Sequence, residues 1–223
     1  MPDKAMSMRP DFFATLALVI GFGLAGTVQA DDQANRQVPI KKLLPYYDLY
    51  LQLAPTDRDG FRLDYLIGVK EGQPRPRLTY VNGTQRIPIQ LDRSGKVLNL
   101  PDQNLIRAGK VEIAGGGQSG SITLNLEPVV PLARTIPATA AANPVQDYAK
   151  AISRAGPLSL AIPKLGGLVF KGVPSGQVVF GDGRRLNLPL EDGNPVFRPA
   201  QAAMRGAATL EFPAVPSKAA FTR

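Results

Sequence analysis

The nine residues FRLDYLIGV, Phe61–Val69, indicate the kind of fold that this chain adopts. Every second position from Phe61 to Val69 is apolar, and most of the positions between them are polar or glycine. A period of two predicts a β-strand that buries one face and leaves the other largely in water. Downstream, Asn82-Gly83 separates two further strand-like runs, and this dipeptide predicts a tight hairpin.

Short elements are expected along the rest of the chain. Helices are predicted at 45–54, where Pro45 suits the first helical position, at 103–108 behind the cap Asp102, at 143–156, and as one turn at 199–205. Strands are predicted at 61–69, 77–81, 84–91, 96–100, 111–114, 122–129, 158–162, 168–173, 177–180, 184–188 and 208–212. The expected fold class is therefore α+β and β-rich, with small, mostly antiparallel sheets.

Two similar heptapeptides, GKVLNLP at Gly95–Pro101 and GRRLNLP at Gly183–Pro189, indicate an internal duplication. Since the predicted elements also recur in one order, we expect two similar modules, each a helix plus a small sheet, with Asn99 and Asn187 at equivalent strand ends. The alternative is a coincidence of common residues. The expected boundaries are 31–130 for the first module, 131–144 for a linker, 145–213 for the second module with a surface-loop insertion at 190–200, and 214–223 for a C-terminal tail.

The first thirty residues have the pattern of a secretory signal peptide. Lys4 and Arg9 precede an apolar run at 12–24, and Val28 and Ala30 provide a small-residue cleavage site. The run is shorter than the ~20 residues that span a bilayer, which favours cleavage after Ala30 over an uncleaved anchor. We therefore expect a bacterial periplasmic or secreted protein with no transmembrane segment after cleavage.

The chain contains no histidine and no cysteine, which restricts the chemistry available to it. A Ser-His-Asp or Cys-His arrangement, a zinc site with such ligands and a disulfide are all excluded. Carboxylate pairs remain, and Asp48, Asp64 and Asp147 are the candidates for a carboxylate-based hydrolase. Asp57 and Asp59 lack the further ligands of a calcium loop, and the glycine-rich stretch 115–121 is expected to be a hairpin loop. No catalytic residue, metal or cofactor is predicted.

Charge and aromatic residues provide the candidate binding residues. The 26 Lys and Arg exceed the 18 Asp and Glu, and the excess lies mainly after residue 130. An anionic lipid or glycan is a suitable partner for a basic face in the cell envelope, whereas export removes most encounters with nucleic acid. Tyr47 and Tyr50 either form a stacking platform for a sugar or pack against the sheet. The candidate ligand-binding residues are Tyr47, Tyr50, Lys171, Arg184, Arg185, Arg198 and Arg205.

Three stretches together resemble an uncharacterised family of exported proteobacterial proteins. They are LLPYYDLYLQL at Leu43–Leu53, FRLDYLIGV at Phe61–Val69 and LNLPDQNLIRAG at Leu98–Gly109. The resemblance covers about 43–113 and implies export, but no activity, cofactor or site residue.

Three functions are compatible with these observations. The sequence favours a non-catalytic exported protein that acts by contact with another protein in the cell envelope. The alternative is a binding module for an anionic lipid or glycan, and a carboxylate-based hydrolase is the third. The oligomeric state is not predicted.

Overall fold

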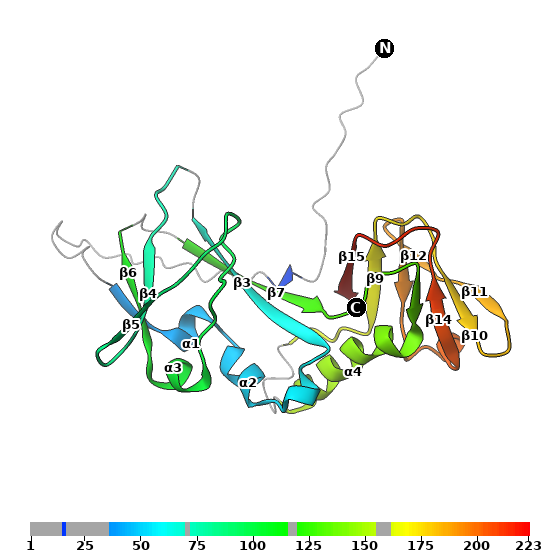
Figure 1. The fold of residues 1–223 in the computed structure, drawn as a ribbon, viewed down its shortest axis with the longest axis horizontal. Coiled ribbons are helices and arrows are strands. Elements are labelled where there is room, and N and C mark those ends of the chain that lie inside the picture. Colours follow the sequence, from blue (N-terminus) through cyan, green and yellow to red (C-terminus); the bar gives the residue numbers. More distant parts are fainter. Residues whose placement is uncertain (1–14, 17–35, 70–71, 116–119, 155–161) are drawn as a thin grey trace, which may run out of the picture.

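The computed structural model describes residues 15–16, 36–69, 72–115, 120–154 and 162–223. The chain is β-rich, with several small antiparallel sheets and few helices, as the sequence predicts. The sheets lie toward the two ends of an elongated molecule, and the helices lie along one side between them (Figure 1). We call residues 36–128 the first half and residues 134–223 the second half.

A four-stranded antiparallel sheet dominates the first half, with strand order β2-β6-β4-β5. Three short helices pack below it because their apolar residues, such as Leu43 and Ile106, are buried there. The strands are β2 (Arg36–Pro39), β4 (Arg77–Asn82), β5 (Gln85–Pro88) and β6 (Lys110–Ala114), and the helices are α1 (Ile40–Leu43), α2 (Tyr47–Gln52) and α3 (Gln103–Ala108).

A long two-stranded ribbon leads from the first half toward the second. Strand β3 (Phe61–Val69) has the predicted bounds and pairs with β7 (Gly120–Pro128) over its whole length. The other edge of β7 pairs with β1 (Thr15–Leu16). The ribbon buries one face, as the alternation of β3 predicts, although Asp64 on its other face is also buried.

Two further antiparallel sheets form the second half, with orders β8-β14-β10-β11 and β12-β13-β9-β15. Their strands are β8 (Thr135–Pro137), β9 (Gly167–Lys171), β10 (Gln177–Phe180), β11 (Arg185–Asn187), β12 (Leu190–Glu191), β13 (Asn194–Phe197), β14 (Ala207–Glu211) and β15 (Lys218–Thr222). The helical elements are α4 (Ala138–Arg154) and the 3-10 turn η3 (Ala202–Met204); a similar turn, η1 (Pro55–Asp57), precedes β3.

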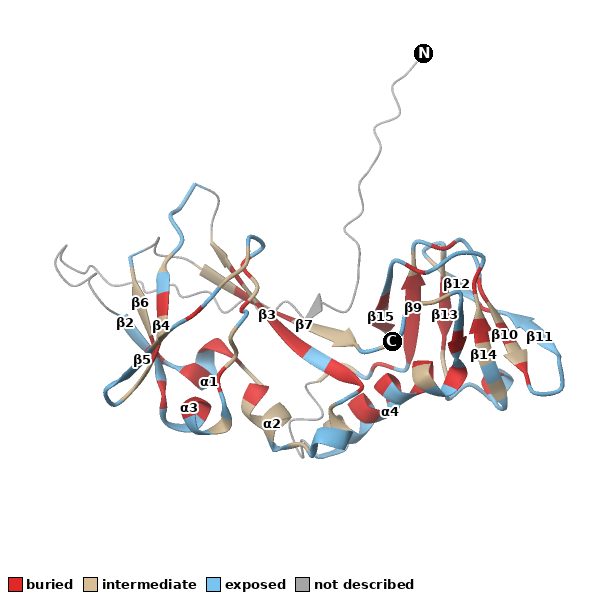
Figure 2. Cartoon of the chain, viewed as in Figure 1, coloured by how far each residue is buried: buried red, intermediate tan, exposed pale blue. Residues whose placement is uncertain are grey.

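The two halves share a pattern of strand pairing. The sheets β2-β6-β4-β5 and β8-β14-β10-β11 are connected in the same way. In each sheet, the strand that comes first in the sequence pairs with the strand that comes last. The last strand also pairs with the second strand, and the second pairs with the third. The first half also contains the antiparallel pair β3 and β7, and the second half contains the antiparallel pair β9 and β15. One continuous hydrophobic core runs through both halves (Figure 2).

Local signals predicted several elements correctly. The Asp102 side chain accepts a hydrogen bond of 2.8 Å from the Leu105 N–H and so caps α3, as expected. Asn82-Gly83 forms the predicted hairpin, with Gly83 at a φ of 57°. In contrast, α2 begins only at Tyr47 because Tyr46 has a φ of 66°, so the helix is shorter than the predicted 45–54. The predicted strand 96–100 is reduced to two isolated bridges, at Lys96 and Val97.

The expected linker at 131–144 is wrong. It contains strand β8 and the first turns of α4, which begins at Ala138 and has Pro144 inside it. Alanine has the highest helix propensity, and Ala138, Ala141 and Ala142 are buried at helical spacing. The small side chains allow this face of the helix to pack close to the sheet. The helix prediction relied on larger apolar residues and therefore missed these first turns.

The expected C-terminal tail and surface-loop insertion are also wrong. Residues 218–222 form β15, which pairs with β9 and buries Ala219 and Phe221. The stretch 190–200 contains the β12–β13 hairpin, whose Val196 and Phe197 are buried. The sequence offered only short apolar runs here, and pairing with β9 is what makes them strands. The strand predicted at 158–162 falls almost entirely outside the described residues, and so does most of the glycine-rich loop at 115–121.

The two Leu-Asn-Leu-Pro stretches do not occupy equivalent positions. Leu186 and Asn187 belong to β11, whereas Leu98 and Asn99 lie in a bend. When the strand pairs of the two sheets are compared, Leu186 takes the place of Ile87. Ile87 pairs with Tyr80 of β4, and Leu186 pairs with Val178 of β10. The apolar residues two positions later also occupy matching places. Ile89 donates its N–H to Leu78 O (2.8 Å), and Leu188 donates its N–H to Gly176 O (2.9 Å). The expected equivalence of Asn99 and Asn187 is therefore wrong.

Candidate functional site

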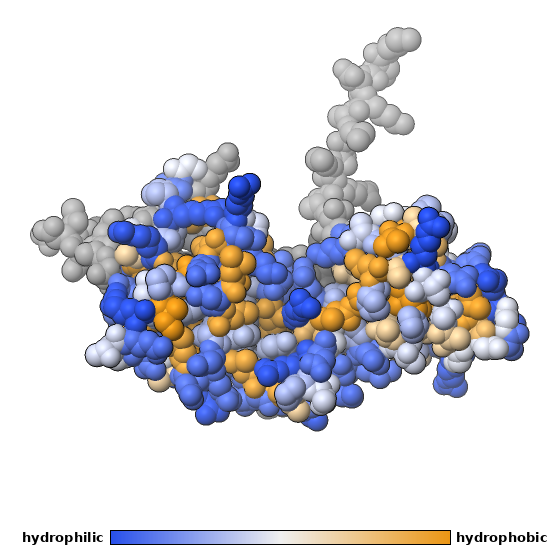
Figure 3. All heavy atoms as spheres, in the orientation of Figure 1, coloured by the Kyte–Doolittle hydropathy of each residue, from blue (hydrophilic) through white to orange (hydrophobic). Residues whose placement is uncertain are grey.

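A groove of about 690 Å³ lies between the two halves. Elements α2, β3 and β7 line it from the first half, and α4, β9 and β15 line it from the second. Apolar surface, orange in Figure 3, continues between the two ends of the molecule. The size is within the range of ligand pockets, roughly 300–1,000 Å³.

The walls of the groove are mainly apolar, for a reason that begins in the sequence. The alternation of β3 directs Phe61 and Leu63 to the same face of the ribbon, and β7 directs Leu124 and Leu126 to that face as well. The opposite wall comes from the second half, with Ala151 and Ile152 of α4, Leu165, Val169 of β9 and Phe221 of β15.

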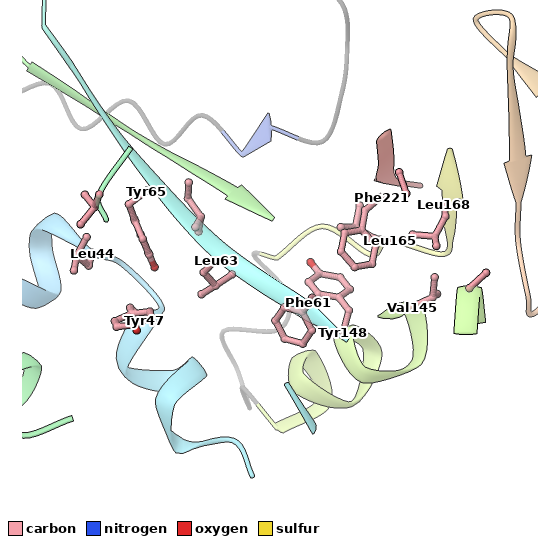
Figure 4. Packing of buried hydrophobic residues seen from close by; sticks show 14 of the residues in the cluster. Leu44, Tyr47, Phe61, Leu63, Tyr65, Val145, Tyr148, Leu165, Leu168 and Phe221 are labelled. Carbon is pink, nitrogen blue, oxygen red and sulfur yellow. The ribbon is translucent and has the colours of Figure 1, made fainter. Parts of the chain in front are cut away.

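A chain of aromatic rings crosses the groove from one half to the other. Tyr50 stacks on Tyr47 with a centroid separation of 5.9 Å and meets Phe61 edge-on at 5.5 Å. Phe61 meets Tyr148 at 5.9 Å, and Tyr148 meets Phe221 at 5.5 Å. Figure 4 shows Phe61, Tyr148 and Phe221 adjacent to one another, and Tyr47 farther away, toward Leu44 and Tyr65. These contacts hold the two walls in a fixed relation.

Two tyrosine hydroxyls of the groove, those of Tyr50 and Tyr148, are bonded to the backbone. Tyr50 donates to Phe61 O at 3.1 Å, and Tyr148 donates to Pro163 O at 2.7 Å. Burial raises the pKa of Tyr50, and it raises the pKa of Tyr148 to about 12. Both side chains are therefore neutral over the physiological pH range, and the centre of the groove carries no charge.

Charged groups also line the groove, among them Arg154 and Glu191, and both of these are paired. Glu191 accepts hydrogen bonds from Arg198 and from Thr222, the latter at 3.1 Å. Arg198 also donates to the carbonyl oxygen of Arg223 at 2.7 Å. Arg154, at the end of α4, forms an ion pair with Asp57 of η1. The Glu191 and Thr222 side chains can interact with a polar group of a ligand there.

The structure separates the two candidate tyrosines. Tyr47 is only 8% exposed and packs edge-on against Tyr65, so its ring cannot act as an open platform for a sugar. Tyr50 is half-buried and lines the groove, with the Arg58 guanidinium 5.5 Å from the centre of its ring. The interpretation of this helix face as packing against the sheet describes Tyr47, and Tyr50 alone contributes to the candidate site.

The five candidate basic residues do not gather at the groove. Arg184 forms an ion pair with Asp182 and Arg185 with Glu211, each at 2.6 Å, in the β10–β11 region. Arg198 pairs with Glu191 at the groove end, next to the start of β9. Lys171 lies at the other end of β9, roughly 13 Å along the strand, beyond the ~8 Å Debye length. Arg205 follows η3, in the segment that leads to β14.

The three candidate carboxylates are also apart from the groove. Asp48 pairs with Lys41 at 3.0 Å, Asp64 with Lys96, and Asp147 with Lys150 at 3.2 Å. None of the three lines the groove, and each has a different lysine as its partner. Within the described residues, no group of three carboxylates could hold a metal ion.

Most groove residues were not identified from the sequence. The alternation in ITLNLEP at 122–128 was visible and places Leu124 and Leu126 on one face, but nothing there indicates what that face meets. Phe221 belongs to the segment expected to be a tail, and its role depends on the pairing of β15 with β9.

Comparison with known proteins adds no assignment: no protein-family model, no curated protein and no solved structure matches the chain. The resemblance to an exported proteobacterial family therefore stays a prediction. Among the helices that the structure describes, none has the length and apolar character needed to span a membrane.

Proposed function

We propose that this is an exported, non-catalytic binding protein that holds one apolar chain, such as the acyl chain of a lipid, in the groove between its two halves. The observation that supports the proposal is the groove itself: about 690 Å³, lined by apolar side chains and by Tyr50 and Tyr148, whose hydroxyls are already hydrogen-bonded. Burial of each methylene group contributes about 0.8 kcal/mol, so a long acyl chain has enough apolar surface to bind.

A lipid suits the groove better than a glycan does. A sugar needs several polar partners that fix its hydroxyl groups, and the central walls supply mainly Leu, Ile, Val and Phe. The polar end, with Arg198, Glu191 and Thr222, is where the head group of an amphiphile would lie. Of the two ligands that the sequence suggests, an anionic lipid or a glycan, the proposal retains the lipid. It places the binding residues in the groove and not on the basic surface.

We also propose that the two halves are copies of one module. The shared strand order of the two four-stranded sheets and the matched pairs β3–β7 and β9–β15 support a duplication. The sequences agree where the pairing begins, since Arg36–Pro39 reads RQVP and Arg134–Pro137 reads RTIP. In this arrangement the groove is the junction at which corresponding elements of the two copies face each other.

Export is the remaining part of the proposal, and it rests on the signal-peptide pattern of residues 1–30. The full 223-residue sequence should therefore be expressed in a bacterial host and the protein recovered from the periplasm. Its N-terminus should be Asp31. Recovery only of membrane-bound chains that begin at Met1 would contradict export by cleavage.

The groove is tested by two alanines of the same helix. Ala151 lines the groove, whereas Ala149 is exposed on α4. Ala151→Phe should fill part of the groove and weaken binding of the fluorescent fatty acid cis-parinaric acid about tenfold or more, since a lost contact of 1.4 kcal/mol already changes affinity tenfold. Ala149→Phe should leave the affinity unchanged. Fluorescence titration, with palmitate as competitor, measures both.

Two outcomes would overturn the lipid proposal. One is that the parent protein does not bind cis-parinaric acid, and the other is that both variants bind it equally well. Arg184→Ser together with Arg185→Ser provides a further comparison, because these arginines lie away from the groove lining. If that pair of changes weakens binding and Ala151→Phe does not, the basic surface is the binding site.

A further inference from the structure

Tyr46 adopts a backbone conformation that is strained for a bulky side chain. Its φ is 66° and its ψ is −7°, which lies in the left-handed region. Among the described residues, Asp192 is the other non-glycine residue with a positive φ, and it forms the β12–β13 turn with Gly193. Asp-Gly is a preferred pair for such a turn, so the conformation of Asp192 follows from its local sequence. That of Tyr46 does not.

Glycine is the residue that the turn at Tyr46 favours. Tyr47 donates its N–H to Leu44 O at 3.3 Å, which closes a turn over residues 44–47. The angles of Tyr46 are close to those of the third residue of a type II turn, a position that usually requires glycine, and Pro45 is favoured at the second. Tyrosine therefore strains this turn, and strain of this kind is concentrated where side chains contact ligands.

The Tyr46 hydroxyl is available to a ligand. Tyr46 is one of three tyrosines that line the groove, together with Tyr50 and Tyr148. The hydroxyls of Tyr50 and Tyr148 donate to backbone carbonyls, whereas the Tyr46 hydroxyl has no hydrogen bond with any described residue. A ligand that fills the groove removes water from this hydroxyl, and a buried donor left unpaired lowers the affinity. The groove therefore favours a ligand that has a hydrogen-bond acceptor at this point.

Tyr46 and Thr222, which is bonded to Glu191, lie at opposite ends of the groove. Tyr46 directly precedes Tyr47, where the chain of aromatic rings begins, and Thr222 directly follows Phe221, where it ends. Four ring-to-ring steps of 5.5–5.9 Å join Tyr47 to Phe221. Figure 4 shows these two rings well apart. The groove thus has a hydrogen-bonding group at each end and mainly apolar walls between them.

We propose that the ligand of the groove is an acyl chain with an oxygen acceptor far from its head group, as in an ω-hydroxy fatty acid, and that Tyr46 selects this ligand. The head group lies with Glu191 and Thr222, the chain follows the apolar walls, and the Tyr46 hydroxyl donates a hydrogen bond to the distant oxygen. This ligand class rests on the lipid function proposed above. One such hydrogen bond gives about a three- to tenfold preference over the unsubstituted chain.

Two fatty acids that differ in one hydroxyl group test this preference. Palmitate and ω-hydroxypalmitate should be compared as competitors of cis-parinaric acid by fluorescence titration. On the parent protein, ω-hydroxypalmitate should compete at a concentration about three- to tenfold lower than palmitate does. Tyr46→Phe keeps the ring and the backbone conformation and removes only the hydroxyl. In this variant the preference should be lost or reversed, because the hydroxyl of the ligand then has no donor, and the affinity for palmitate should not fall.

Tyr80→Phe provides the matched control. The Tyr80 hydroxyl is buried and also has no hydrogen-bond partner among the described residues, but Tyr80 does not line the groove. Its removal should leave the preference for ω-hydroxypalmitate unchanged, and thermal unfolding shows that both variants are folded. Equal competition by the two fatty acids on the parent, or an undiminished preference in Tyr46→Phe, would overturn the role of Tyr46 and leave the lipid function in place. A parent protein that binds no cis-parinaric acid contradicts both.

Discussion

Replacing Phe221 by alanine is expected to lower the free energy of unfolding by about 3–5 kcal/mol, the usual cost of truncating a buried phenylalanine. Phe221 is only 2% exposed, and its ring packs on Tyr148 at 5.5 Å. It lies on β15 opposite Leu168 of β9 and also lines the groove. The change therefore removes packing at the junction of the two halves, and chemical denaturation measures the loss.

Val215 provides the matched control for this prediction. It lies in the same C-terminal segment but is 54% exposed. Val215→Ala should change the free energy of unfolding by no more than about 0.5 kcal/mol, as is usual at exposed positions. Similar small effects of both substitutions would show that residues 214–223 do behave as a tail.

Gly95→Ala is expected to destabilise the protein by at least about 2 kcal/mol more than Gly183→Ala. Both glycines have a positive φ, 90° and 85°, which costs an L-residue about 1–2 kcal/mol. A Cβ at Gly95 would also collide with the carbonyl oxygen of Ile67, whose N–H is bonded to Gly95 O at 2.8 Å. A Cβ at Gly183 would meet nothing within 4 Å.

The comparison of these two glycines is informative because they open the two similar heptapeptides. Relief of the collision at Gly95 requires the loop to move away from β3, since a backbone oxygen cannot rotate aside as a flexible side chain can. Denaturation midpoints of the two variants, measured under the same conditions, give the difference. Equal destabilisation would mean that the 92–97 turn does not rest on β3 as described.

Local patterns predicted those elements whose residues carry their own signal. Phe61–Val69 alternates strictly enough to define β3, Asp102 caps α3, and Asn82-Gly83 makes a hairpin whatever surrounds it. The duplication was inferred from Leu-Asn-Leu-Pro, yet the pairing relates Leu186 to Ile87 instead. A four-residue match of common residues contains too little information to align two modules, whereas strand order reflects the whole chain.

The sequence by itself determined the chemistry that this protein lacks and the strands that alternate. Without histidine or cysteine, no tertiary arrangement can supply a His- or Cys-based site. Only the tertiary structure decided that Phe221 and Ala219 belong to a strand, that the alanines from Ala138 onward form a buried helix, and that Leu124 and Phe61 face a groove. The physical reason is that burial is a property of two surfaces in contact. A segment's own residues show which face is apolar, and the partner that covers that face comes from distant parts of the chain.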